Sequence, residues 1–144
     1  MITLSETKVF DPRDASTGSG GAELVDATVV QRGEQWWMYL AGQAHGSGAT
    51  DIYSASLPKG APLLATGWKV NRSAGDEPMP VAGRDLSRAW DGKGGRHCPC
   101  YVRGWDHGKR EWRERIYYAG AAENLWGRSS PGDEAQVKLS LIHI

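Results

Sequence analysis

The strongest constraint on the fold is a pair of strand-forming segments separated by a short turn. "LVDATVV" at residues 24–30 is dense in β-branched residues, and "QWWMYLAG" at 35–42 is rich in aromatic ones. "QRGE" lies between them, with Gly33 as its turn residue. Such residues favour strands, and a short spacer containing glycine joins two strands as a hairpin. The sequence therefore predicts a β-hairpin, with the acidic residue Asp26 near the start of its first strand.

The pattern extends beyond this hairpin. "DIYSASL" at 51–57 alternates, so Tyr53, Ala55 and Leu57 are expected on one face of a third strand. "GWKV" at 67–70 predicts a short fourth strand, which gives an antiparallel meander. Within it, the adjacent Trp36 and Trp37 must face opposite sides, and Asp51 reads as a turn residue.

A second unit repeats the first. "DATVV" at 26–30 aligns with "CPCYV" at 98–102, and "MYLAG" at 38–42 aligns with "IYYAG" at 116–120. Two matched pieces are an internal repeat, typical of propeller blades. The charged run "GKREWRER" at 108–115 lies between "CPCYV" and "IYYAG" and predicts a solvated turn.

The remaining segments frame these units. Residues 71–95 are a polar, turn-rich insertion, and a loop of this length is usually functional or else flexible. Residues 128–144 depart from the blade pattern, so we treat this tail as doubtful and expect a fragment. The expected class is all-β, with blade-like units at about 22–70 and 96–127.

Charge and composition narrow the partners. The chain has 17 basic and 17 acidic residues, which argues against nucleic acid or an anionic membrane held by general electrostatics. Seven Trp and five Tyr stand against one Phe, and these amphipathic rings suit half-exposed sites and the flat faces of sugars. The first residues, "MITLSETKVFDPRD", lack the apolar stretch of a signal peptide, so cytoplasm is the default expectation.

At "VDATVVQRGEQWWMYLAG" and "HCPCYV…RIYYAG" the chain resembles the five-bladed β-propeller glycosidases, the family 43-like group of arabinanases, β-xylosidases and invertase-like enzymes. Related propellers without hydrolase activity share these motifs. The resemblance implies antiparallel four-stranded blades, about two of them, in one partial propeller domain over residues 1–144. It also implies a carbohydrate substrate, and it would admit calcium in the central channel, although no residue here specifies a cofactor.

In that family three acids gather at the central funnel: a general base, an acid that tunes pKa, and a general acid. Asp26 matches the base or the tuning acid, because it opens the innermost strand of its unit. The general acid lies in a Glu-small-Pro setting, and the nearest match is "HCP", with His97 in place of the glutamate. Three readings stay open: His97 serves as acid or sugar ligand, the true acid lies elsewhere, or the propeller does not hydrolyse glycosides.

Other polar and aromatic residues of the loops are candidates for substrate contact. A zinc site is not expected, because a C-x-C pair with one adjacent histidine lacks a second ligand pair. Cys98 and Cys100 read instead as small buried residues on one strand face. The expected function is glycoside hydrolysis, and the alternative is a non-catalytic carbohydrate-binding propeller. The substrate-binding candidates are Glu23, His45, Trp90, Asp91, Glu123 and Asn124.

Overall fold

The computed structural model describes residues 23–43, 50–63, 67–76, 78–82, 95–121 and 137–143. Within these residues the chain is all-β, with seven strands in one open sheet and no helix. The predicted all-β class is therefore confirmed. The described residues include no helix that is long and apolar enough to cross a membrane.

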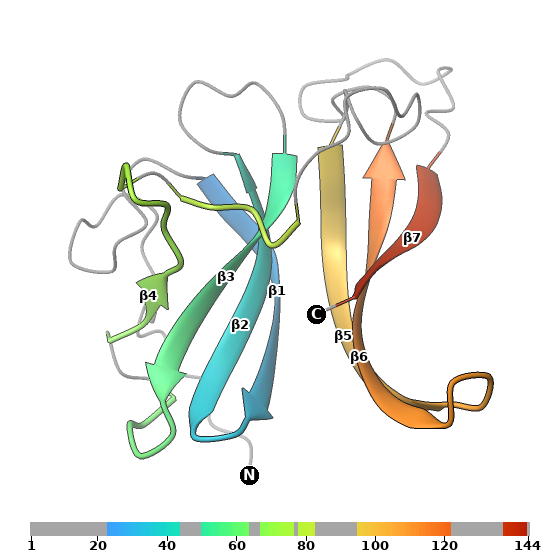
Figure 1. Ribbon diagram of the computed structural model, residues 1–144. Coiled ribbons are helices and arrows are strands. Elements are labelled where there is room, and N and C mark those ends of the chain that lie inside the picture. The colour runs from blue at the N-terminus through green and yellow to red at the C-terminus, as the bar shows by residue number, and fades with distance from the viewer. Residues whose placement is uncertain are drawn as a thin grey trace, which may run out of the picture.

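The first unit is an antiparallel meander, shown in blue to green in Figure 1. It contains β1 (Glu23–Arg32), β2 (Gln35–Gln43), β3 (Thr50–Pro58) and the short β4 (Lys69–Val70). A two-residue turn joins β1 to β2, and its Gly33 has a φ of 58°, a left-handed conformation that glycine adopts without strain. The predicted hairpin and the predicted fourth strand are both present.

The second unit consists of β5 (Gly95–Asp106), β6 (Glu111–Ala121) and β7 (Val137–His143), also antiparallel. The strand β7 lies inside the tail that the repeat pattern leaves out of the unit. Its sequence, "VKLSLIH", begins by alternating apolar and polar residues, which is the period of a half-buried strand. The strand β7 pairs with β6 on the side away from β5, just as β3 pairs with β2 on the side away from β1.

The two units meet where β3 and β5 begin. Thr50 and Gly95 form a parallel bridge, so the strand order is β1-β2-β3-β5-β6-β7 with β4 also on β3. Gly95 has a φ of 115°, and a Cβ added there would lie 2.7 Å from the carbonyl oxygen of Thr50. Only glycine allows this close approach of the two backbones.

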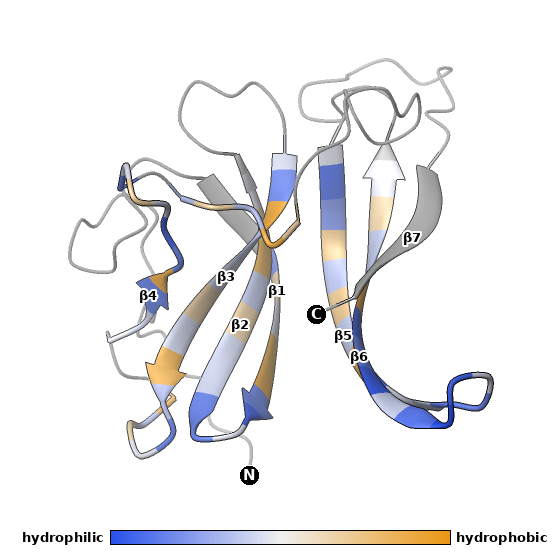
Figure 2. Ribbon diagram, viewed as in Figure 1, coloured by the Kyte–Doolittle hydropathy of each residue, from blue (hydrophilic) through white to orange (hydrophobic). Residues whose placement is uncertain are grey.

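Two apolar clusters lie on opposite faces of the first unit. One consists of alternate residues of β2 and β3 covered by Trp68, including Met38 and Leu57, and Trp36 packs against it. The other joins Tyr39 and Ile52 to residues of β6, and Trp37 packs against it. Figure 2 shows the apolar residues concentrated in these strands. The two tryptophans therefore face opposite sides as predicted, and the second cluster holds the two units together.

A buried ion pair reinforces the same junction. Arg96 Nη1 lies 3.4 Å from Asp51 Oδ1, and the two side chains are 4% and 6% exposed. The guanidinium also donates to the carbonyl oxygen of Ala82 and stacks over Tyr118. Asp51 is thus a buried partner of the second unit, and its interpretation as a simple turn residue is wrong. Sequence spacing could not reveal this pairing, because its members lie 45 positions apart.

Candidate functional site

The two hairpins carry the same irregularity at the same place. In the first, the register shifts between Val25 and Ala27, which leaves Asp26 as the extra residue of a β-bulge. In the second, the register shifts between His97 and Cys100. Asp26 and Cys98 both have left-handed backbones, with φ of 50° and 49°. These are the positions that the alignment of the two pieces places together, so the repeat extends to backbone conformation.

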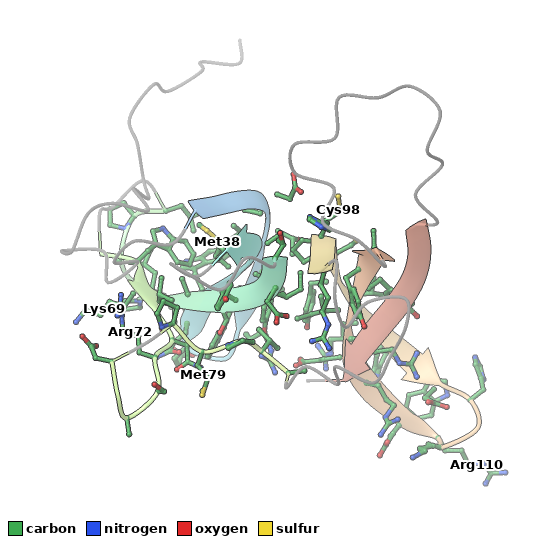
Figure 3. All side chains as sticks on the ribbon, turned by 90° about the horizontal axis from the view of Figure 1, so that it is seen from above. Met38, Lys69, Arg72, Met79, Cys98 and Arg110 are labelled. Atoms are coloured by element: carbon green, nitrogen blue, oxygen red, sulfur yellow. The ribbon has the colours of Figure 1, made fainter. Side chains whose placement is uncertain are left out.

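The two bulges also face one another. The thiol of Cys98 donates a hydrogen bond to Asp26 Oδ2 over 3.5 Å, and both residues are exposed to solvent. Figure 3 labels Cys98 where β5 approaches the first hairpin. A bulge redirects its side chain away from the regular alternation of a strand. Two bulges therefore bring together side chains 72 positions apart.

His97 lies beside this contact and is only 8% exposed. Burial lowers the pKa of His97, and the charge of Asp26 partly opposes that effect by raising it. The imidazole is therefore biased toward its neutral form, which can both donate and accept a hydrogen bond. The structure brings together the two predicted catalytic candidates, Asp26 and His97.

Cys98 does not behave as the small buried residue that the sequence predicts. Cys98 and Cys100 are free thiols, and both are exposed on either side of the buried Pro99. Burial raises the pKa of the Cys98 thiol, and the charge and hydrogen bond of Asp26 raise it further. A protonated thiol is a weak nucleophile, so Cys98 acts here as a hydrogen-bond donor.

Most of the predicted substrate-binding residues fall in parts of the chain that the structure does not describe. His45, Trp90, Asp91, Glu123 and Asn124 fall outside the described residues. Glu23 begins β1 three residues before Asp26, and only its backbone is described. Over the described part of the chain, no group of three or more His, Cys, Asp or Glu residues could hold a metal ion.

Sequence reasoning missed a second polar cluster between the hairpins. Arg32 Nη2 lies 2.5 Å from Glu114 Oε2, and Arg32 Nη1 donates to the hydroxyl of Tyr39 over 2.7 Å. The rings of Trp37, Tyr39 and Tyr101 stack in series, with centroids 6.4 and 6.2 Å apart. The only sequence signal was the aromatic richness of both pieces. This cluster joins β1 to β6 and β2 to β5, and so links the two hairpins that carry the bulges.

The contact of Asp26 with Cys98 can be tested by titration. In Asp26→Asn we expect the pKa of the Cys98 thiol to fall, because the thiolate no longer faces a negative charge. The pKa of His97 should also fall, because the imidazolium loses an attractive charge. The rate of iodoacetamide alkylation against pH, in a Cys100→Ser background, measures the first, and NMR titration of the imidazole measures the second.

The matched control is Asp76→Asn, which changes another aspartate with a left-handed backbone, at φ 61°. It should leave both pKa values unchanged. An unchanged thiol pKa in Asp26→Asn would contradict the contact.

The site is thus one exposed carboxylate, one thiol donor and one largely buried imidazole on two converging bulges. Comparison with known proteins adds no relative to this description. The chain matches no protein family, no curated protein and no solved structure.

Proposed function

We propose that this chain is part of a carbohydrate-acting β-propeller, in which the converging bulges of β1 and β5 face the central funnel. The observation that carries the proposal is the pairing of Asp26 with Cys98 at equivalent positions of two repeated hairpins, 3.5 Å apart. Adjacent blades of a propeller bring equivalent inner-strand positions side by side in this way. The two hairpin units would then be neighbouring blades.

In the hydrolytic form of the proposal, Asp26 is the base that takes a proton from water. Its exposure gives water access, and the Cys98 hydrogen bond orients one carboxylate oxygen while the other stays available. An inverting glycosidase also needs a second carboxyl group at about 6.5–9.5 Å, which protonates the leaving oxygen. In this form His97 would take the role of that acid. It could donate a proton only after becoming protonated, because its lowered pKa favours the neutral imidazole.

The non-catalytic alternative is favoured by a specific observation. Among the described residues, Asp26 interacts with the Cys98 thiol and the His97 imidazole, and neither is a carboxyl group. A carboxylate flanked by neutral donors is suited to accepting hydrogen bonds from sugar hydroxyls. This form predicts binding of an oligosaccharide at Asp26 without cleavage.

One variant tests both forms. Asp26→Asn removes the charge and keeps the shape, and asparagine tolerates the left-handed backbone of this position, so the fold should persist. We expect the dissociation constant for arabino- or xylo-oligosaccharides to rise about tenfold or more, since a hydrogen bond to a charged group contributes roughly 1.5–3 kcal/mol. If the chain hydrolyses 4-nitrophenyl arabinofuranoside or xyloside, the rate should fall about 10²–10⁴-fold.

Asp76→Asn is again the control and should change neither quantity. Binding that Asp26→Asn weakens, without any hydrolysis, selects the non-catalytic form. Hydrolysis that the variant abolishes selects the enzyme. Wild-type protein that neither binds nor cleaves these sugars would overturn the proposal.

A further inference from the structure

The second hairpin is longer than the first, and the extra residues form a separate structure. In the first hairpin, Arg32 and Gln35 are the last pair, and two turn residues join them. At the equivalent pair, Gly104 and Arg113, the strands instead continue through two more pairs and a four-residue turn. Eight residues replace two, an insertion of six. We refer to residues 105–112 as the tip; Figure 1 shows it projecting away from the rest of the sheet.

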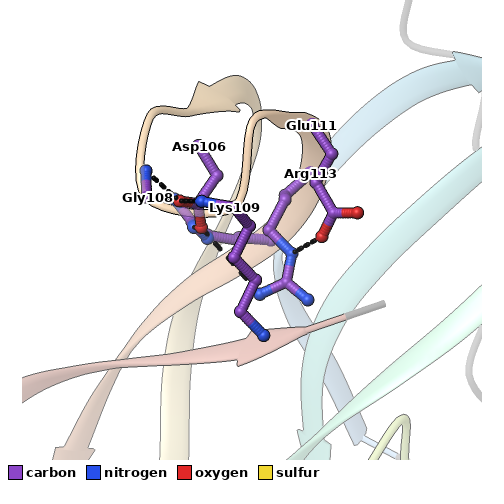
Figure 4. Close-up of polar contacts among 6 residues, drawn as sticks. Asp106, Gly108, Lys109, Glu111 and Arg113 are labelled. Atoms are coloured by element: carbon purple, nitrogen blue, oxygen red, sulfur yellow. Dashed lines mark hydrogen bonds and ion pairs between the residues drawn. The ribbon is translucent and has the colours of Figure 1, made fainter.

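The tip is an ordered platform, since the carboxylate of Asp106 accepts several hydrogen bonds (Figure 4). Its Oδ1 accepts from the backbone N–H groups of Gly108 and Lys109 at 3.0 and 3.1 Å, and its Oδ2 lies 2.7 Å from Arg115 Nη2. The N–H of Arg110 also donates to the Asp106 carbonyl oxygen. The hydrogen bond from Lys109, together with the nearby arginines, holds the pKa of Asp106 below its ordinary value.

One face of the tip presents two indole rings to solvent. Trp105 and Trp112 are directly opposite across the strands, and their rings meet edge to face with centroids 5.9 Å apart. They remain 44% and 61% exposed. Figure 2 shows the surrounding tip as hydrophilic, so the rings are not part of a larger apolar surface.

A cation on the same face lacks the partner that its neighbours have. The guanidinium of Arg103 lies over the Trp112 ring, 5.3 Å from its centroid. On β6, Arg113 pairs with Glu111 at 2.9 Å and Arg115 pairs with Asp106. No ion pair of Arg103 occurs within the described ranges, because Glu114, opposite it, pairs with Arg32 across the hairpins. Arg103 therefore offers a positive charge beside two exposed rings.

We propose that this face binds an oligosaccharide that contains uronic acid, with sugar rings against Trp105 and Trp112 and a uronate carboxylate on Arg103. Indole rings present flat apolar faces with a polar edge, and guanidinium pairs with carboxylates through two parallel hydrogen bonds. An open hollow continues from the same face at Glu114 toward the turn of the first hairpin. Its lining residues are Arg32, Gly33, Glu34, Gln35, Trp37 and Glu114.

The dimensions favour a sugar chain over a macromolecular surface. The tip is two strands wide, about 5 Å between strand axes, which matches one row of sugar rings. A stable protein interface requires about 800 Å² on each partner, far more than two rings and one guanidinium supply. Nucleic acid is disfavoured because the chain has no excess of basic residues.

This surface is independent of the bulges. Trp105 follows Cys98 by seven residues of β5, which corresponds to about 23 Å of extended strand. Removal of the Asp26 carboxylate should therefore leave binding at the tip intact. A result at one surface does not decide the result at the other.

The test is the affinity of the full chain for a hexamer of galacturonic acid, measured by calorimetry, with xylohexaose as the neutral sugar. We expect Trp112→Ala to weaken uronate binding about tenfold, and Arg103→Gln to weaken it by a similar factor while removing its dependence on salt. Lys109→Gln removes a positive charge from the turn of the tip, and Val102→Ala truncates an exposed side chain on the opposite face of β5. Both controls should bind as the wild type does.

All these side chains are exposed, so circular dichroism and the unfolding midpoint should match those of the wild type. Equal affinity for xylohexaose would overturn the charge recognition that Arg103 is assigned. Binding of an oligonucleotide instead of the uronate would overturn the ligand class. Uronate binding that survives Trp112→Ala would overturn the location.

Discussion

Replacing Arg96 by methionine should lower the free energy of unfolding by about 3–5 kcal/mol. The substitution keeps an unbranched apolar stem but removes the positive partner of Asp51, whose side chain is only 6% exposed. The carboxylate would remain buried with the Ile52 N–H as a hydrogen-bond donor. Loss of the interactions of Arg96 with Ala82 and Tyr118 adds to the effect. Urea denaturation measures the change.

Changing Asp51 in the same protein tests whether its unpaired buried charge causes the loss of stability. Arg96→Met combined with Asp51→Asn replaces the buried charge by an amide, so it should recover a large part of the lost stability. Lys59→Met is the surface control, because Lys59 and Glu34 form an ion pair at 3.3 Å with side chains 46% and 87% exposed. It should change stability by less than about 1 kcal/mol. A double variant as unstable as the single one would show that burial of Asp51 is not the cause.

Replacing Gly95 by alanine should destabilise the chain by more than about 2 kcal/mol. A side chain at this φ of 115° is strained, and its Cβ would lie 2.7 Å from the Thr50 carbonyl oxygen and 3.0 Å from the Thr50 nitrogen. The bridge between β3 and β5 would have to open, which would weaken the junction that the second apolar cluster and the Asp51–Arg96 pair also hold. The denaturation midpoint and the protection of the Thr50 amide from hydrogen exchange measure the two effects.

Two other glycines separate the contributions. Gly33 has a left-handed φ of 58° and nothing within 4 Å of an added Cβ, so Gly33→Ala should show only the conformational penalty, roughly 1–2 kcal/mol. Gly104 has open space and no left-handed backbone, so Gly104→Ala should be neutral or stabilise its strand by up to about 1 kcal/mol. Equal effects at Gly95 and Gly33 would contradict the close approach to Thr50.

The local sequence pattern was enough to predict that the chain is all-β. The alternation of "DIYSASL" places Tyr53, Ala55 and Leu57 in one apolar cluster and Ile52 in the other, as expected for a strand. The turn at Gly33 also follows from residues near in sequence, and the alignment of Asp26 with Cys98 follows from comparing the two repeated pieces. Strand alternation and the hairpin turn depend on neighbouring residues, which composition and period encode directly.

The same pattern failed where a regular period is interrupted. Cys98 and Cys100 were expected on one buried face, yet both are exposed, next to the register shift that follows His97. A bulge adds one residue to one strand and changes the direction of the side chains around it, and no simple residue type announces it. The strand β7, within residues 128–144, likewise depends on its pairing with β6, which the repeat pattern does not show.

The sequence by itself determined an all-β chain built of two similar hairpins, with Asp26 at the mouth of the first. Only the tertiary structure decided which groups meet across the hairpins: Asp26 with Cys98, Asp51 with Arg96, and Arg32 with Glu114. These pairs join residues from 45 to 82 positions apart. The reason is physical: strand formation is governed by near neighbours, whereas contact between units depends on how their faces pack, which only the folded chain defines.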